Sequence, residues 1–150
     1  MQGKPKTMYM KRISLFSLVL LALLVNSCSD NGKKYSFDKD HHIYYKGDSL
    51  TEIDAIHLAA YFNKQGYYKT GQQADVQLRK AKDTFTVNFI VDKAKITPEM
   101  ESNFILFGGY ISRDVFSGKP VVITLSEPNW DTYKNLGYAR PPEADSSVTR

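Results

Sequence analysis

Apolar and polar side chains alternate most clearly in the segment 84–91, whose apolar inward positions are Phe85, Val87, Phe89 and Val91. This period of two predicts a strand with one buried face. A shorter alternation in 76–79 predicts a strand before it, joined by a hairpin turn at 80–83. The β-favouring runs 42–45 and 121–125 predict two further strands.

Two other segments repeat apolar residues at helical spacing. In the first, Ser49 with Glu52, or alternatively Thr51 with Asp54, could form the capping pair, and Gly66 ends the segment. Its apolar face comprises Ile53, Ile56, Ala60 and Phe62.

The second helix is predicted from Thr97, an N-cap followed by Pro98, to Gly118. Its core-facing stripe contains Met100, Phe104, Phe107, Gly108, Ile111 and Val115. Gly108 and Gly109 lie inside it, where each glycine costs about 1 kcal/mol relative to alanine. Their presence favours close packing of this helix against another element over a ligand approaching its backbone.

The resulting order is β-α-β-β-α-β, which predicts the α+β class. Right-handed crossovers place both helices on one face of a sheet. We therefore expect a ferredoxin-like βαββαβ two-layer sandwich, with a four-stranded antiparallel sheet and two helices on one face.

The N-terminal residues have the layout of a secretory signal. Lys4, Lys6, Lys11 and Arg12 precede an apolar run, 13–25, that is shorter than the ~20 residues of a membrane span. Starts at Met1, Met8 or Met10 all keep a basic residue before the run.

The run leads directly to Cys28, the only cysteine in the chain, through Leu24, Val25, Asn26 and Ser27. This string resembles the lipobox of bacterial lipoproteins, with Asn26 departing from the usual small or aliphatic residue. The resemblance implies cleavage before Cys28 and attachment of lipid to it. An ordinary secretory signal with an incidental cysteine is the alternative.

These patterns divide the chain into a lipoprotein signal peptide (1–27), a lipidated cysteine with a polar tether (28–40), an α+β domain (41–136) and a disordered tail (137–150). Removing the signal removes four cations and no acids, which leaves 16 basic and 16 acidic residues. The apparent basic charge therefore gives no support to nucleic-acid binding.

The sequence contains none of the common catalytic or phosphate-binding motifs, and lipidation of Cys28 would withdraw its only thiol. His41 and His42 are adjacent in a predicted strand and would point to opposite faces, so they cannot readily share a metal ion. Glu127 and Asp131 are interpreted as solvated turn residues rather than paired catalytic carboxylates. We expect no enzyme activity, no cofactor and no metal site.

The sheet face turned away from the helices is the expected binding surface. It would present Arg79, Thr86 and Asn88, and one residue of the doublet Tyr44-Tyr45 could add an aromatic contact. We take all five as candidate binding residues.

The run Leu58-Ala-Ala-Tyr-Phe-Asn-Lys-Gln-Gly-Tyr67, together with the βαββαβ order, distantly resembles the SPOR domain, a peptidoglycan-binding module. We carry over no binding residues from that family. The whole chain resembles small cell-envelope lipoproteins, so we expect a non-catalytic interaction module anchored by lipid to the periplasmic or outer-membrane side of a bacterial envelope. Its partner would be another envelope protein, or alternatively peptidoglycan.

Overall fold

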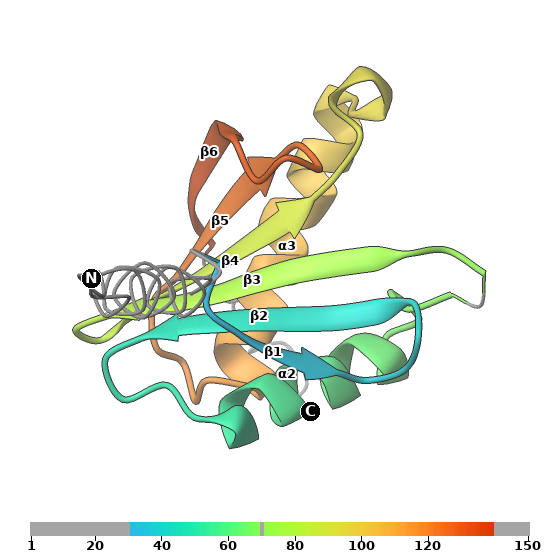
Figure 1. The fold of residues 1–150 in the computed structure, drawn as a ribbon. Coiled ribbons are helices and arrows are strands. Elements are labelled where there is room, and N and C mark those ends of the chain that lie inside the picture. The colour runs from blue at the N-terminus through green and yellow to red at the C-terminus, as the bar shows by residue number, and fades with distance from the viewer. Residues whose placement is uncertain (1–30, 70, 140–150) are drawn as a thin grey trace, which may run out of the picture. The chain divides into compact units, whose positions relative to one another are not determined.

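The computed structural model describes residues 31–69 and 71–139, which form one sheet and a layer of helices (Figure 1). The strands are β1 (Lys33–Ser36), β2 (His41–Gly47), β3 (Ala74–Ala81), β4 (Thr84–Ile90), β5 (Val121–Ser126) and β6 (Thr132–Ala139). The helices are α2 (Glu52–Lys64), the short 3-10 helix η2 (Lys93–Lys95) and α3 (Pro98–Asp114). Within the described residues, no helix is long and apolar enough to cross a membrane.

The six strands lie in the sheet in their sequence order. β2 is parallel to β3 and β4 is parallel to β5, whereas the other three pairs are antiparallel. Helix α2 connects the first parallel pair and α3 connects the second. The chain therefore contains two successive βαβ units, joined by the β3–β4 hairpin.

The predicted ferredoxin-like sandwich with a four-stranded antiparallel sheet is wrong, although the α+β class is confirmed. In the predicted topology a third strand lies between the two strands of each crossover, but here those strands are direct neighbours. The hydrophobic pattern could not reveal this difference, because alternation defines each strand's buried face and carries no information about its neighbours.

Both edge strands lie where the sequence predicted irregular chain. β1 falls within the predicted tether, 28–40. No apolar alternation marks this strand in the sequence, because its residues Lys33–Ser36 are mostly polar and largely exposed. β6 follows the last predicted strand and ends at Ala139, inside the predicted tail, 137–150. The predicted signal peptide and Cys28 lie outside the described residues, as do residues 140–150.

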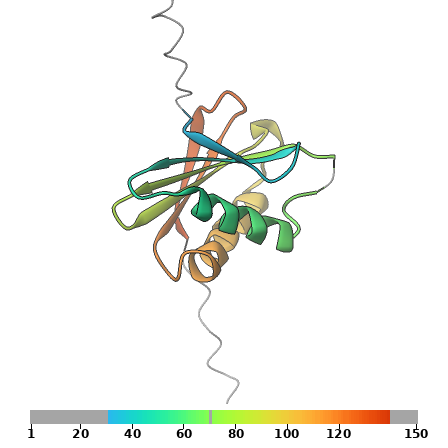
Figure 2. The ribbon, with the colours of Figure 1, turned by 60° about the horizontal axis from the view of Figure 1, so that its bottom comes forward.

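Both helices cover the same face of the sheet (Figure 2). Between them and the strands lies the hydrophobic core, whose largest fully buried side chains include Phe62, Phe89, Ile43, Leu58, Leu78, Ile111, Ile123 and Leu125. Gly108 brings α3 close to β5, since a Cβ there would lie 2.6 Å from Ile123 and 2.7 Å from Ala139. The packing interpretation of this glycine is confirmed.

Side chains at the first turns define where the helices begin. At α2, Asp54 Oδ2 accepts hydrogen bonds from the Thr51 backbone N–H (2.8 Å) and hydroxyl (2.9 Å), so Thr51 rather than Ser49 occupies the cap. Thr97 caps α3 by accepting a 3.2 Å hydrogen bond from the Met100 N–H. These caps satisfy amide groups that the first turn of a helix leaves unpaired.

Candidate functional site

Four of the five predicted binding residues share the face of the sheet that carries no helix. In the strand register Tyr44 lies beside Gln77, which lies beside Asn88, and Arg79 lies beside Thr86. Tyr45 belongs to the neighbouring row and faces the helices, where it is only 7% exposed and forms part of the core. Tyr45 therefore does not belong to the expected binding surface, since successive residues of a strand point to opposite faces.

Asn88 is buried and holds strands together rather than facing solvent. Its Oδ1 accepts hydrogen bonds from Thr124 Oγ1 at 2.9 Å and Ser126 Oγ at 2.8 Å. Ser126 Oγ in turn lies 2.9 Å from Thr132 Oγ1, which links β5 to β6. Among the described residues Asn88 Nδ2 has no partner. This network makes Asn88 a structural residue of β4, because its acceptor oxygen is already shared.

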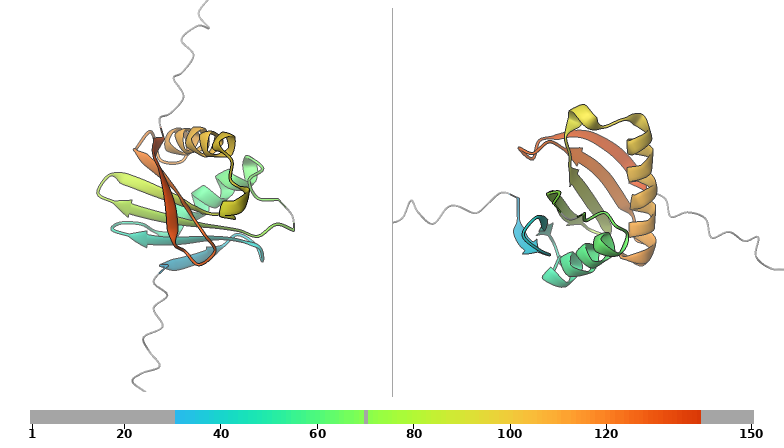
Figure 3. Two further views of the ribbon diagram at one scale, coloured as in Figure 1. Left: turned by 90° about the horizontal axis from the view of Figure 1, so that it is seen from above. Right: turned by 90° about the vertical axis from the view of Figure 1, so that its right-hand side faces the viewer.

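The helix-free face is concave, and an aromatic contact crosses it. The rings of Tyr44 on β2 and Trp130 in the β5–β6 turn meet edge to face, with centroids 4.7 Å apart. In a flat sheet β2 and β5 would lie about 14 Å apart, so the sheet must curve to bring these rings together. Figure 3 shows this curvature. Lys34 Nζ lies 5.6 Å from the centre of the Tyr44 ring and completes an aromatic and basic cluster.

An aromatic-lined pocket of about 590 Å³ opens on the helix side, where α2 ends and α3 begins. The ring of Tyr67 contacts Phe62, Phe89 and Phe107, and Phe89 also contacts Phe104. The outer edge of this ring cluster forms the pocket floor. The pocket is lined by Gln65, Gly66, Tyr67, Lys69, Gln72, Met100, Asn103, Phe104 and Phe107.

The chemistry of this pocket suits binding better than bond-making. Three carboxamides, from Gln65, Gln72 and Asn103, surround the apolar floor, and Lys69 is the only charged residue among the described residues that line the pocket. Burial, with a smaller effect from Asp75, raises the pKa of Tyr67 far above its usual value. Tyr67 therefore stays a neutral phenol at physiological pH.

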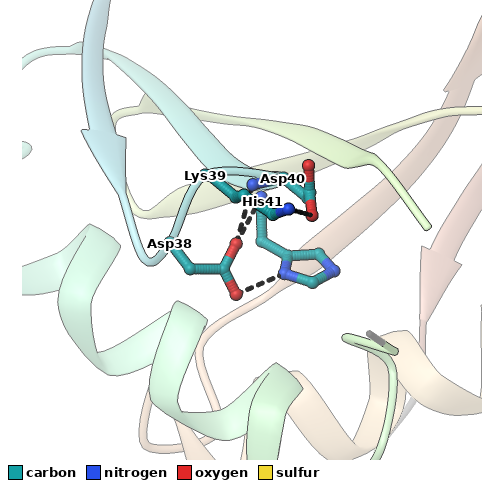
Figure 4. Close-up of polar contacts among 4 residues, drawn as sticks. All are labelled: Asp38, Lys39, Asp40 and His41. Atoms are coloured by element: carbon teal, nitrogen blue, oxygen red, sulfur yellow. Dashed lines mark hydrogen bonds and ion pairs between the residues drawn. The ribbon is translucent and has the colours of Figure 1, made fainter. Parts of the chain in front are cut away.

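A third candidate is the pair Asp38–His41 at the start of β2 (Figure 4). Asp38 Oδ1 accepts from the backbone N–H groups of Asp40 (2.8 Å) and His41 (2.9 Å), and Oδ2 lies 2.7 Å from His41 Nδ1. Because an ionised carboxylate only accepts, Nδ1 carries the proton in this contact. The hydrogen bond from the His41 ring, followed by those from the backbone, lowers the pKa of Asp38.

This pair anchors β2 to the loop that follows α2. The His41 ring is buried and stacks on Tyr68, with centroids 4.4 Å apart. His42 lies on the opposite face of the strand, as predicted, and the described residues contain no group of three potential metal ligands. An Asp–His pair supports nucleophilic catalysis only beside an accessible nucleophile. The buried imidazole instead indicates a structural role.

The sequence pointed to the helix-free face and missed the pocket. The helical spacing places Met100, Phe104 and Phe107 on the core-facing stripe of the second helix. In the structure these side chains are partly exposed, and their exposure depends on the path of the loop after α2. The only local signal was Gly66-Tyr67, which marked the end of the helix without showing that Tyr67 folds back toward α3.

A family model matches residues 35–137, from β1 into β6, under the description AF_1994_N, family N-terminal domain. The chain belongs to this family. No curated protein and no solved structure matches the chain. The family match covers the folded domain and begins after Cys28, so it carries no information about lipidation. The βαββαβ order occurs along the chain from β2 to β5, but the strands pair in sequence order with a further strand at each edge, and the family match gives no support for a likeness to the SPOR domain.

Proposed function

We propose that this protein is a non-catalytic, lipid-anchored component of a bacterial cell envelope that binds a partner protein through the aromatic-lined pocket. The observation that carries the proposal is a pocket of about 590 Å³ between the end of α2 and α3, floored by Tyr67, Phe104 and Phe107. Known ligand sites are typically concave, mostly apolar and of about 300–1,000 Å³.

The partner's chemistry follows from the pocket lining. Aromatic rings and the Met100 thioether suit an apolar or aromatic side chain. The carboxamides can donate to and accept from a peptide backbone, because each carries both a carbonyl oxygen and an NH₂ group. Lys69 is complementary to a carboxylate. We therefore expect the partner to present an apolar anchor residue beside an acidic one on an exposed segment.

The remaining candidate groups give little support to an enzyme. No carboxylate, histidine or cysteine is among the described residues that line the pocket. General acid–base chemistry at neutral pH needs a group that titrates near that pH, and Tyr67 does not. The Asp38–His41 pair lies elsewhere, with its imidazole buried.

Site-specific photocrosslinking in intact cells tests the proposal. We place a benzoylphenylalanine at Asn103, which lines the pocket, and at Ser102, an exposed neighbour on α3 that does not. A single adduct from position 103 alone is expected, and the crosslinked protein is then identified and purified. Its binding to this chain should weaken at least tenfold with Met100→Lys and stay unchanged with Ser102→Lys. Equal crosslinking from both positions, or binding insensitive to Met100→Lys, would contradict the proposal.

Peptidoglycan binding through the helix-free face is the alternative, and the contact between Tyr44 and Trp130 is the observation that favours it. Aromatic rings flanked by polar side chains such as Thr86 suit sugar rings. Co-sedimentation with purified sacculi distinguishes the two functions. Pelleting that Trp130→Ala abolishes would favour the glycan, whereas a protein that stays in the supernatant excludes it.

A further inference from the structure

The chain enters the folded domain across the helix-free face of the sheet. The Asn31 carbonyl accepts a 2.9 Å hydrogen bond from Gln77 Nε2 on β3. Gly32 then lies so close to β2, with φ +95°, that a Cβ would stand 2.6 Å from the Tyr45 carbonyl oxygen. The domain is therefore ordered from its first described residue.

Because Asn31 already contacts the sheet, the distance between the domain and an anchor on Cys28 is limited. Only Ser29 and Asp30 separate Cys28 from Asn31. Three residue steps span at most about 11 Å, even when fully extended. The inference rests here on the lipid anchor of the proposed function: acyl chains on Cys28 would hold the helix-free face within a few residue lengths of the lipid headgroups.

The end of the sheet at which β1 begins is strongly basic. We call it the basic end, and its cations are Lys33, Lys34, Lys46, Arg79, Lys80 and Lys82. The register brings them together, since Lys33 pairs with Tyr45 at the end of β2, Lys46 lies directly beside Arg79, and Lys82 is in the β3–β4 turn.

The rest of the described chain has the opposite charge. Four acids accompany the six cations of the basic end: Asp48 and Asp83 in the turns, and Glu52 and Asp54 in the first turn of α2, which follows β2 there. Elsewhere the described residues include eight cations and nine acids. Lys33, Lys34 and Lys82 form no ion pair within residues 31–69 and 71–139. These charges are available to an external anion, and they lie at the end from which the anchor would emerge.

Tyr44 lies on the same concave face beside Lys34 of the basic end, whereas Trp130, whose ring contacts Tyr44, belongs to the β5–β6 turn at the other end of the sheet. Tyrosine and tryptophan are enriched at membrane–water interfaces, because their rings are apolar and their polar groups can reach the headgroups. Lysine and arginine near an anionic leaflet are attracted to it electrostatically. Charge and anchor position thus indicate the same kind of partner, and Tyr44 adds an aromatic ring beside Lys34.

We propose that the basic end is a membrane-docking surface that rests on anionic phospholipid headgroups. The lipid on Cys28 supplies stable attachment, and the basic end fixes the orientation of the domain. The aromatic-lined pocket lies at the other end of the sheet, where α2 returns to the start of β3, so docking presents it away from the bilayer.

The test uses the lipidated mature protein, reconstituted into vesicles of phosphatidylcholine alone or with 30% phosphatidylglycerol. Because Cys28 would be acylated, a fluorophore can be placed at one introduced cysteine. Asp83→Cys reports on the basic end, and Ser102→Cys on α3 is the matched position away from it. A nitroxide on the lipid headgroups quenches a dye that lies at the membrane surface.

In phosphatidylglycerol vesicles we expect the dye at residue 83 to be quenched at least twofold more than the dye at residue 102. This difference should be absent in vesicles of phosphatidylcholine alone and should shrink in 0.5 M salt. The triple reversal Lys33→Glu, Lys34→Glu and Lys82→Glu should abolish the difference. The matched reversal Lys39→Glu, Lys64→Glu and Lys93→Glu changes the net charge equally and should preserve it.

Flotation of the vesicles separates failure of this inference from failure of the anchor. If the protein floats but the dye is quenched equally at both positions, the docking surface is contradicted and the anchor is not. The same conclusion holds if the first triple reversal leaves the difference in quenching unchanged. Protein that does not float with either vesicle overturns the anchor, and with it both proposals.

Discussion

Asp38 shows how one side chain organises the start of a strand. Its two oxygens accept from two backbone N–H groups and one imidazole, all within 2.9 Å, and the imidazole is buried against Tyr68. Hydrogen bonds to a charged carboxylate are stronger than those between neutral groups. The turn before β2 therefore depends on Asp38 being ionised.

We predict a pH-dependent contribution from Asp38. Its pKa in the folded protein lies below the usual 3.8, so the ionised form stabilises the fold above the unfolded-state pKa. That stability is lost as the pH falls through the lower, folded-state pKa. Urea unfolding at pH 7 and pH 3 should show a smaller loss of stability in Asp38→Asn than in the wild type. The control Asp40→Asn should lose as much as the wild type, and equal losses in all three proteins would contradict this role.

At the residue scale, the sequence predicted which face of the sheet a side chain lies on better than it predicted how exposed that side chain is. Alternation placed Arg79 and Thr86 on the helix-free face, where the structure has them. It could not decide which residue of Tyr44-Tyr45 points inward, because both are aromatic. Nor could it show that Asn88 is buried, since that burial depends on hydroxyls from β5 and on the curvature of the sheet.

Among the elements, α2 and α3 were predicted most closely because their caps are local. Thr97 with Pro98, and Thr51 with Asp54, act within one helical turn. β6 was missed because it lacks a regular alternation: its register shifts twice against β5, and Gly137 adopts φ +84°. Such irregularities, like the lysines on β1, are common on edge strands and discourage pairing with other chains.

The contact of α3 with the sheet gives a prediction at this scale. Gly108→Ala would place a methyl group against Ile123 and Ala139, in a space that the structure fills. Overpacking a core typically costs about 1–3 kcal/mol, and we expect a loss of unfolding free energy in that range. Denaturant titration measures it, with Ser102→Ala on the exposed side of the same helix as the control. An unchanged or raised stability in Gly108→Ala would contradict the close approach.

At the scale of the whole molecule, strand order separates this fold from the predicted one. Lys46 on β2 and Arg79 on β3 are direct neighbours, whereas Thr86 on β4 lies one strand further away. Adjacent strands are about 4.8 Å apart, within the Cα separations of about 4.4–6.8 Å that disulfides span, and alternate strands are about 10 Å apart.

Paired cysteines therefore test the topology. Lys46→Cys with Arg79→Cys should form a disulfide under mild oxidation, seen as a mobility shift on a non-reducing gel. Lys46→Cys with Thr86→Cys should remain reduced, apart from slow bonds between molecules. Bridging in the second pair but not in the first would show that another strand lies between β2 and β3.

The central claim for the whole molecule is that lipid on Cys28 holds the domain at a membrane. The most direct measurement is the intact mass of the protein purified in detergent from bacterial envelopes, followed by fragmentation of its N-terminal peptide. We predict a chain that begins at residue 28 and carries a diacylglyceryl group on the cysteine sulfur, and a Cys28→Ala variant that lacks this modification and leaves the membrane fraction. A wild-type chain with a free Cys28 thiol, or one cleaved at another position, would contradict the account.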